Sequence, residues 1–181
     1  MAARSLPTAP NFGANSELTS TQLNALVTYQ EFWSSPPCFR AEQHVSGGQS
    51  IPNNANTQVT CETTVHDSDS GLSTSSPYSY VIPFAGVWDF AGTVGMASNT
   101  TGIRQPGILQ NGTYINGAGP EFNEFSGVMV MDVTANGVLC NVGDVIGLYV
   151  FQNTGAALLT YTALGQGCSV FTGRLVSLQN P

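Results

Sequence analysis

Residues 87–96 have the sequence VWDFAGTVGM, in which large apolar side chains alternate with small or polar ones. Successive side chains of a β-strand point to opposite faces of the sheet. Trp88 and Phe90 therefore share one face, and Asp89 and Thr93 share the other. This alternation predicts a half-buried strand whose tryptophan lies in the core of a β-domain.

Two further segments are apolar at every position, GVMVM at 127–131 and VIGLYVF at 145–151. A two-layer β-sandwich buries only the inner face of each sheet. Strands that are apolar on both faces need a second cover, and another copy of the chain supplies it most simply. The side chains we expect at this interface between copies are Val128, Val130, Leu148 and Val150.

From residue 41 to 181 the chain consists of short apolar runs separated by Gly, Asn and Ser. Twenty glycines and ten prolines in 181 residues also suit short strands and frequent turns. The sequence predicts an all-β sandwich. Its expected strands span 43–45, 57–66, 79–82, 87–96, 103–110, 125–134, 145–152, 157–164 and 169–178.

Residues 1–40 differ from this pattern. The segment 1–15 has no periodicity and predicts an extended arm, whereas Thr19 and Gln22 match a capping box that predicts a helix over residues 20–33. The Pro36-Pro37 pair then ends the helix. A single short helix is marginal alone in water, so it must dock, and we expect residues 1–40 to anchor the chain to other proteins. The expected anchor side chains are Leu23, Leu26, Val27 and Trp33.

Charge is scarce in this chain. It has four arginines, no lysine and a net charge of −7, with only 8% charged residues. Without a cationic track it is not expected to bind nucleic acid, and without a polybasic segment it is not expected to bind an anionic membrane. We also expect no secretory or membrane-spanning segment, because no apolar run has the required length. So few charges suggest that partners cover much of the surface.

No constellation of residues predicts catalysis, a metal or a cofactor. The two histidines, His44 and His66, have no GxSxG-type nucleophile nearby, so solvent-facing roles are favoured. Residues 67–71 (DSDSG) resemble the start of a calcium loop, but no glutamate closes the loop and a polar turn is favoured. The Asn-Gly pair at 111–112 predicts a hairpin turn rather than a glycosylation site.

The four cysteines are widely spaced and include no CxxC pair, which favours buried, reduced thiols. One bridge between strands remains the alternative. The residues concerned are Cys38, Cys61, Cys140 and Cys168.

Several motifs resemble the globular-head domain of the complement and tumour-necrosis-factor superfamily. They include YVIPFAGVW at 80–88, ILQNGT at 108–113, VGDVI at 142–146 and FTGRL at 171–175. This resemblance covers about residues 44–178. It implies a ten-strand jelly roll that packs as a homotrimer, with no catalytic residues to carry over.

The preceding segment narrows the resemblance. LTSTQLN at 18–24 and WSSPP at 33–37 resemble small virion proteins of tailed actinobacterial phages, commonly labelled minor tail proteins. This implies a virion protein at the tail tip or baseplate, joined to other virion proteins through residues 1–40.

Two alternatives stay open. One is a trimeric capsid decoration protein. The other is a carbohydrate-binding adhesin that grips a glycan of the host surface through aromatic and amide side chains. The residues expected to contact such a glycan are Tyr114, Asn116, Phe122 and Asn123.

Overall fold

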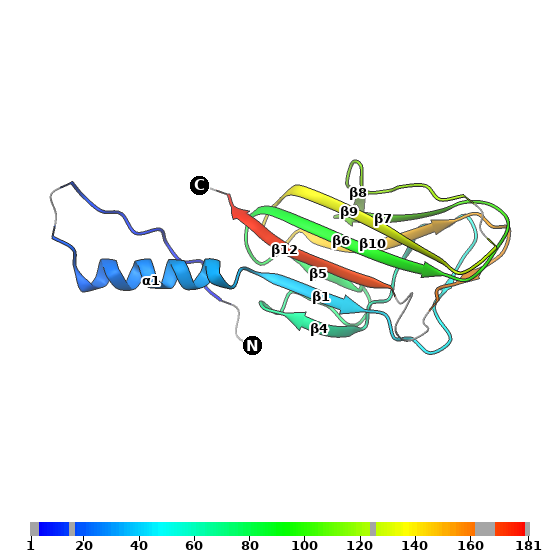
Figure 1. Cartoon of the computed structure of the whole chain (residues 1–181), viewed down its shortest axis with the longest axis horizontal. Coiled ribbons are helices and arrows are strands. Elements are labelled where there is room, and N and C mark those ends of the chain that lie inside the picture. The colour runs from blue at the N-terminus through cyan, green and yellow to red at the C-terminus, as the bar shows by residue number, and fades with distance from the viewer. Residues whose placement is uncertain (1–3, 15–16, 124–125, 162–168, 180–181) are drawn as a thin grey trace.

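The computed structural model describes residues 4–14, 17–123, 126–161 and 169–179, and shows a sandwich of two five-stranded antiparallel sheets (Figure 1). The first sheet has the order β4 (Thr63–Asp67), β1 (Cys38–Glu42), β12 (Val170–Leu178), β6 (Gly86–Met96), β9 (Met129–Cys140). The second has the order β3 (Thr57–Gln58), β10 (Val145–Gln152), β7 (Arg104–Gln110), β8 (Thr113–Tyr114), with β5 (Ser79–Val81) also paired to β10. A small pair, β2 (Ser50–Ile51) and β11 (Leu158–Leu159), lies outside both.

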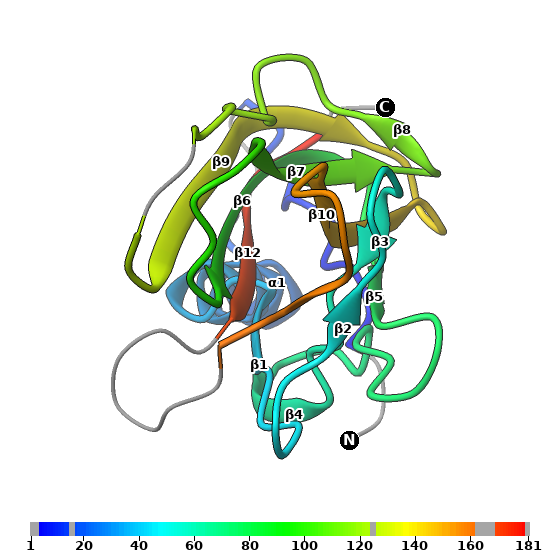
Figure 2. The ribbon, with the colours of Figure 1, turned by 90° about the vertical axis from the view of Figure 1, so that its right-hand side faces the viewer.

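Figure 2, viewed from the end opposite α1, shows the first sheet on one side of the core and β3, β5 and β10 on the other. These ten strands confirm the predicted all-β jelly-roll sandwich.

The core is centred on aromatic side chains from both sheets. As the alternation in β6 predicts, Trp88 and Phe90 are fully buried and their rings are parallel, with centroids 6.1 Å apart. The indole N–H of Trp88 donates to the carbonyl oxygen of Phe84 at 3.1 Å, so its polar group is satisfied. Tyr80, from the second sheet, stacks on Phe39 of β1 at 4.0 Å. Aromatic side chains from the two sheets therefore contact each other in the core.

Several predicted strands change in the structure. The run 57–66 is two strands in different sheets, because the chain turns sharply where the Cys61 N–H donates to the Val59 carbonyl. No strand forms at 43–45. Instead β1 begins at Cys38, three residues before the predicted start of the domain. The strand predicted at 125–134 is β9, which begins at Met129 and continues to Cys140; residue 125 lies outside the described residues.

The prediction that Leu148 and Val150 lie at an interface between copies is wrong. β10 has the predicted bounds, but both side chains are buried in the core of the single chain. The outward positions are Tyr149 and Phe151, which remain half-buried. A run that is apolar on both faces predicts a strand without indicating which face is inside.

The N-terminal segment confirms the predicted helix and arm. α1 (Ser20–Ser34) begins at a capping box in which Thr19 and Gln22 exchange hydrogen bonds. The arm, residues 4–14, has no regular structure and runs outward beside α1, which returns toward the head (Figure 1). We call residues 4–35 the stalk and the sandwich the head. Among the described residues, no helix is long and apolar enough to cross a membrane.

We expect Trp88→Ala to destabilise the head by about 3–5 kcal/mol, the usual cost of deleting a buried aromatic side chain. Urea unfolding followed by circular dichroism measures this. Val87→Ala is the matched control, because Val87 immediately precedes Trp88 in β6 and points to the half-exposed face. Equal losses in the two variants would contradict the placement of Trp88 at the centre of the core.

Candidate functional site

One arginine joins the stalk to the head. The Arg4 guanidinium donates to both carboxylate oxygens of Asp69 at 2.9 and 2.7 Å, and to the carbonyl oxygen of Ser35 at 2.6 Å. It also lies over the ring of Phe32, 5.4 Å from the centroid. Arg4 therefore connects the arm, the end of α1 and a loop of the head. We call these contacts the Arg4 clamp.

The carboxylate in this clamp is held in its charged form. The Asp69 side chain has no exposed surface. Burial alone would raise its pKa, but hydrogen bonds from Arg4 and Ser68 hold the pKa of Asp69 below its ordinary value. The ion pair is therefore intact over the neutral range.

The loop that carries Asp69 is the polar turn that the sequence favours over a calcium loop. The Asp67 carboxylate accepts from the backbone N–H groups of Asp69, Gly71 and Leu72. Because Asp69 itself binds Arg4, both carboxylates of the turn already have partners in the chain. Among the described residues, no group of three or more His, Cys, Asp or Glu is placed to hold a metal ion.

α1 docks on the head through its last turn. Phe32 is 5% exposed and packs edge-to-face on Phe84 of the head, with ring centroids 5.5 Å apart. Trp33, a predicted anchor residue, packs on Phe32 and is half-buried, so it helps to fix α1 to the head. Phe32 was not among the predicted anchor residues, although its position one turn after Tyr29 indicates a second apolar face of the helix.

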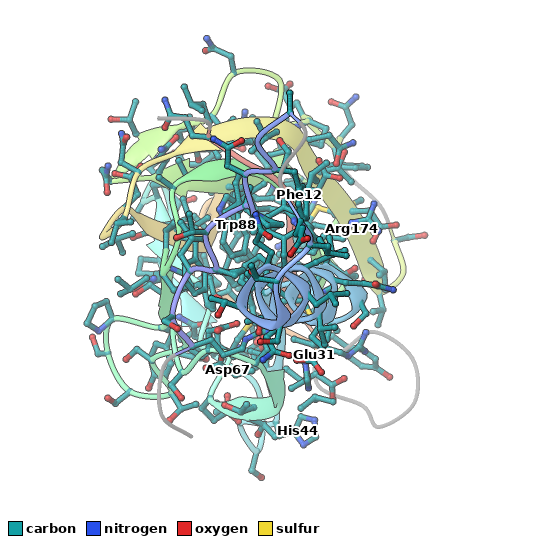
Figure 3. The ribbon with its side chains drawn as sticks, turned by 90° about the vertical axis from the view of Figure 1, so that its left-hand side faces the viewer. Phe12, Glu31, His44, Asp67, Trp88 and Arg174 are labelled. Atoms are coloured by element: carbon teal, nitrogen blue, oxygen red, sulfur yellow. The ribbon has the colours of Figure 1, made fainter. Side chains whose placement is uncertain are left out.

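The other predicted anchor residues lie on the open side of α1. Leu23, Leu26 and Val27 are 45%, 42% and 50% exposed. No described part of the chain covers them. Three more apolar side chains are exposed on or near the arm, namely Leu6, Phe12 and Leu18. Figure 3 views the molecule from this end, with Phe12 and Glu31 of the stalk labelled.

The head has a second group of exposed apolar side chains at the end where α1 joins it. Both Cys140 of β9 and Leu178 of β12 pair with Gly86, so the ends of these strands meet here. The exposed apolar residues at or close to these strand ends and the neighbouring 141–145 turn form a group that we call the apolar base. It consists of Val81, Leu139, Val142, Val145 and Val176.

The stalk and the apolar base together hold most of the exposed large apolar side chains in the described part of the chain. Only five others are exposed, namely Val65, Tyr114, Val128, Val130 and Leu159. Large apolar patches on soluble proteins usually mark interaction sites. The end of the molecule with the stalk is therefore the candidate docking surface.

Two of the predicted interface residues remain available to a partner. Val128 and Val130 are 40% and 49% exposed beside and on β9, which is an edge strand of the first sheet. An interface between copies at these residues stays a prediction.

The four residues predicted to contact a glycan fall into two places. Tyr114 and Asn116 line the same two cavities beside the β7–β8 hairpin. Phe122 lies at the opposite end of β7, where it exchanges backbone hydrogen bonds with Arg104, and Asn123 follows it. The structure thus brings the first two together and separates them from the other two.

The histidines and cysteines have ordinary surroundings. His44 is exposed and contacts Glu42 at 3.0 Å, and His66 is exposed on β4. Hydrogen bonds from Arg40 and His44 lower the pKa of Glu42.

Cys38 is half-buried, whereas Cys61 and Cys140 are buried. Burial, with the nearby Asp144, raises the pKa of the Cys140 thiol to about 12, so it stays protonated. Cys168 lies outside the described residues.

Comparison with known proteins identifies the architecture. No family model and no curated protein sequence matches the chain. The globular domain of a zebrafish complement 1qA protein superposes over 80% of this chain and all of its own, with a TM-score of 0.54 and 16% identity. The fold is that of the C1q and tumour-necrosis-factor domains. A tumour necrosis factor from S. frugiperda, Eiger, gives a TM-score of 0.57 at 9% identity, over 81% of this chain and 97% of its own.

A virus protein has the same C1q/TNF-like fold. The PRD1 vertex protein P5 gives a TM-score of 0.55 at 20% identity, over 78% of this chain and 98% of its own. In each case the superposed region is of the size of the head.

We expect Arg4→Ala to loosen the stalk, because it leaves the buried Asp69 carboxylate without its cation. Breaking one partner of a buried pair costs about 3–5 kcal/mol, and the partial exposure of Arg4 reduces this to about 1–3 kcal/mol. Limited proteolysis of the arm should be faster while the head stays folded. Arg174→Ala is the control, because the Arg174 side chain is 70% exposed and its contact with Asp89 is long, at 3.5 Å.

The clamp should also depend on pH in one direction. The pKa of Asp69 is lower in the folded chain, so its contribution is complete above the unfolded value of about 4 and is lost as the pH falls below it. Proteolysis of the wild-type arm should therefore accelerate below about pH 4, and that of Asp69→Asn should not. An equal acceleration in both would contradict the role of the ion pair.

Proposed function

We propose that this chain is a structural protein of a bacteriophage particle, attached through its stalk and apolar base and displaying its head. The observation that supports this most is the concentration of exposed apolar side chains at one end of the molecule. Burial of such surface is the main favourable term in protein association. The C1q/TNF-like fold of the PRD1 vertex protein supports a virion setting.

We further propose that three copies of the head associate. The resemblance in sequence implies a trimer, and Val128 and Val130 offer an apolar contact at the edge strand β9. An edge strand has unpaired backbone groups that a neighbouring copy can cover. The chain has no catalytic function in this proposal.

Within the particle we propose a minor tail protein at the tail tip or baseplate. The phage-like segments at 18–24 and 33–37 favour this position, because they lie at the start of α1 and at its junction with the head. A capsid decoration protein is the second candidate, favoured by the vertex protein with the same fold. Quantitative mass spectrometry of purified virions separates the two, since decoration needs hundreds of copies and a tail tip needs a few.

We expect the triple variant Leu23→Ser, Leu26→Ser, Val27→Ser to fold but to be lost from virions, because it removes the apolar face of α1. Incorporation is measured by immunoblot of purified particles made without the wild-type protein. Leu159→Ser is the control, since Leu159 is 47% exposed beside the far end of β6. Normal incorporation of the triple variant would refute attachment through α1.

We expect the purified protein to have a mass of three times 19.0 kDa in native mass spectrometry. Val130→Asp should shift it toward the monomer, because three carboxylates would meet at an apolar contact. Val65→Asp is the control, placing the same charge at an exposed valine of β4, the opposite edge of the sheet. A monomeric wild-type protein would overturn the trimer.

A further inference from the structure

The ring of Tyr114 is fixed in place although it is exposed. One face packs on Gly107 of β7, so closely that a methyl group at residue 107 would come within 2.1 Å of the ring. Its hydroxyl donates to the side-chain oxygen of Asn56 at 2.9 Å. The residue is nevertheless 37% exposed. Tyr114 therefore offers an aromatic ring that is held in place and partly exposed.

Two cavities flank this ring. The larger, about 610 Å³, lies between the β7–β8 hairpin and residues 136–138 of β9. The smaller, about 280 Å³, lies against the loop at 115–120 that follows the hairpin. Tyr114, Ile115 and Asn116 line both. The larger cavity is within the range of about 300–1,000 Å³ that ligand sites occupy.

Among the described residues, no charged side chain lines either cavity. Some of the lining amides are committed to the protein. Gln105 donates to the carbonyl oxygen of Gly119, and Gln110 and Asn111 donate to Asp144. In the part of the chain that the structure describes, the amides of Asn116 and Asn136 have no such partner, so their donors and acceptors are free to bind a ligand.

We propose that this cavity, formed by Tyr114, Asn116 and Asn136, binds a neutral saccharide. The apolar C–H face of a sugar ring stacks on an exposed aromatic ring, and its hydroxyls exchange hydrogen bonds with free amides, which both donate and accept. An anionic ligand would find no cation in the lining. A purely apolar ligand would leave the two amides unsatisfied.

The residues of this site differ from the four that the sequence predicts. It keeps Tyr114 and Asn116 of the predicted residues and excludes Phe122 and Asn123. It adds Asn136 of β9, which is 20 residues after Asn116 in the sequence. All its residues come from one copy of the chain. The inference therefore goes beyond the proposed attachment to a particle and does not depend on it.

The test uses the purified full-length protein and a panel of linear tetrasaccharides. Saturation-transfer-difference NMR and isothermal titration measure binding of glucan, mannan, galactan and arabinan tetrasaccharides, with tetragalacturonate as the acidic comparison. We expect at least one neutral probe to bind and the acidic probe not to bind.

Point variants locate the binding. Tyr114→Ala should weaken it about tenfold by removing the stacking surface, and Asn116→Ala or Asn136→Ala about three- to tenfold by removing one hydrogen-bonding group. Tyr114→Phe keeps the ring and should weaken it less than Tyr114→Ala does. Asn123→Ala is the control amide outside the cavity and should bind like the wild type.

The proposal is overturned if no neutral probe binds at millimolar concentration, if the acidic probe binds as well, or if Tyr114→Ala binds like Asn123→Ala. Circular dichroism and native mass spectrometry of Tyr114→Ala verify that its fold and oligomeric mass are unchanged. Virion incorporation of the same variant reports on the proposed attachment separately, because the stalk and apolar base are intact in it.

Discussion

The contact between the rings of Phe39 and Tyr80, 4.0 Å apart, joins the two sheets, and much of the molecule depends on it. Residues against these rings must be small. At Gly173, a methyl group would lie 2.5 Å from the ring of Phe39, and at Gly71 it would lie 2.6 Å from the ring of Tyr80. Gly71 belongs to the turn that carries Asp69. The packing of the core therefore sets the path of the loop to which the stalk is tied, and a single chain of contacts runs from the centre of the head to Arg4.

Local patterns in the sequence predicted the elements whose environment is decided locally. The alternation in β6 gave the correct inward face because its two faces differ in polarity. The capping box at Thr19 gave the correct start of α1 because all its hydrogen bonds lie within four residues. β10 was located correctly by its apolar run, but its inward face was misassigned, because Leu148 and Tyr149 are both apolar enough for a core. Only the register with β7 settles which of them points inward.

The candidate sites depend on contacts that no local pattern indicates. Arg4 and Asp69 are 65 residues apart, and neither has a neighbour in sequence that marks it as half of an ion pair. The apolar base collects valines and a leucine from several separate segments, each unremarkable as a single exposed side chain. Asn136 lines the same cavity as Tyr114 only because β9 lies beside the β7–β8 hairpin. These placements follow from the jelly-roll topology, which is itself a long-range property.

The arginines limit how this protein can recognise anything. Each of the four already has an acceptor in the chain: Asp69 for Arg4, Glu42 for Arg40, the carbonyl of Asn99 for Arg104 and Asp89 for Arg174. With no lysine, the chain has no uncommitted fixed cation with which to attract an acidic partner. Recognition of an acidic partner through charge is therefore disfavoured. The molecule exposes apolar side chains at the stalk and apolar base, and neutral hydrogen-bonding groups beside Tyr114. The proposed functions therefore use interactions that need no cation.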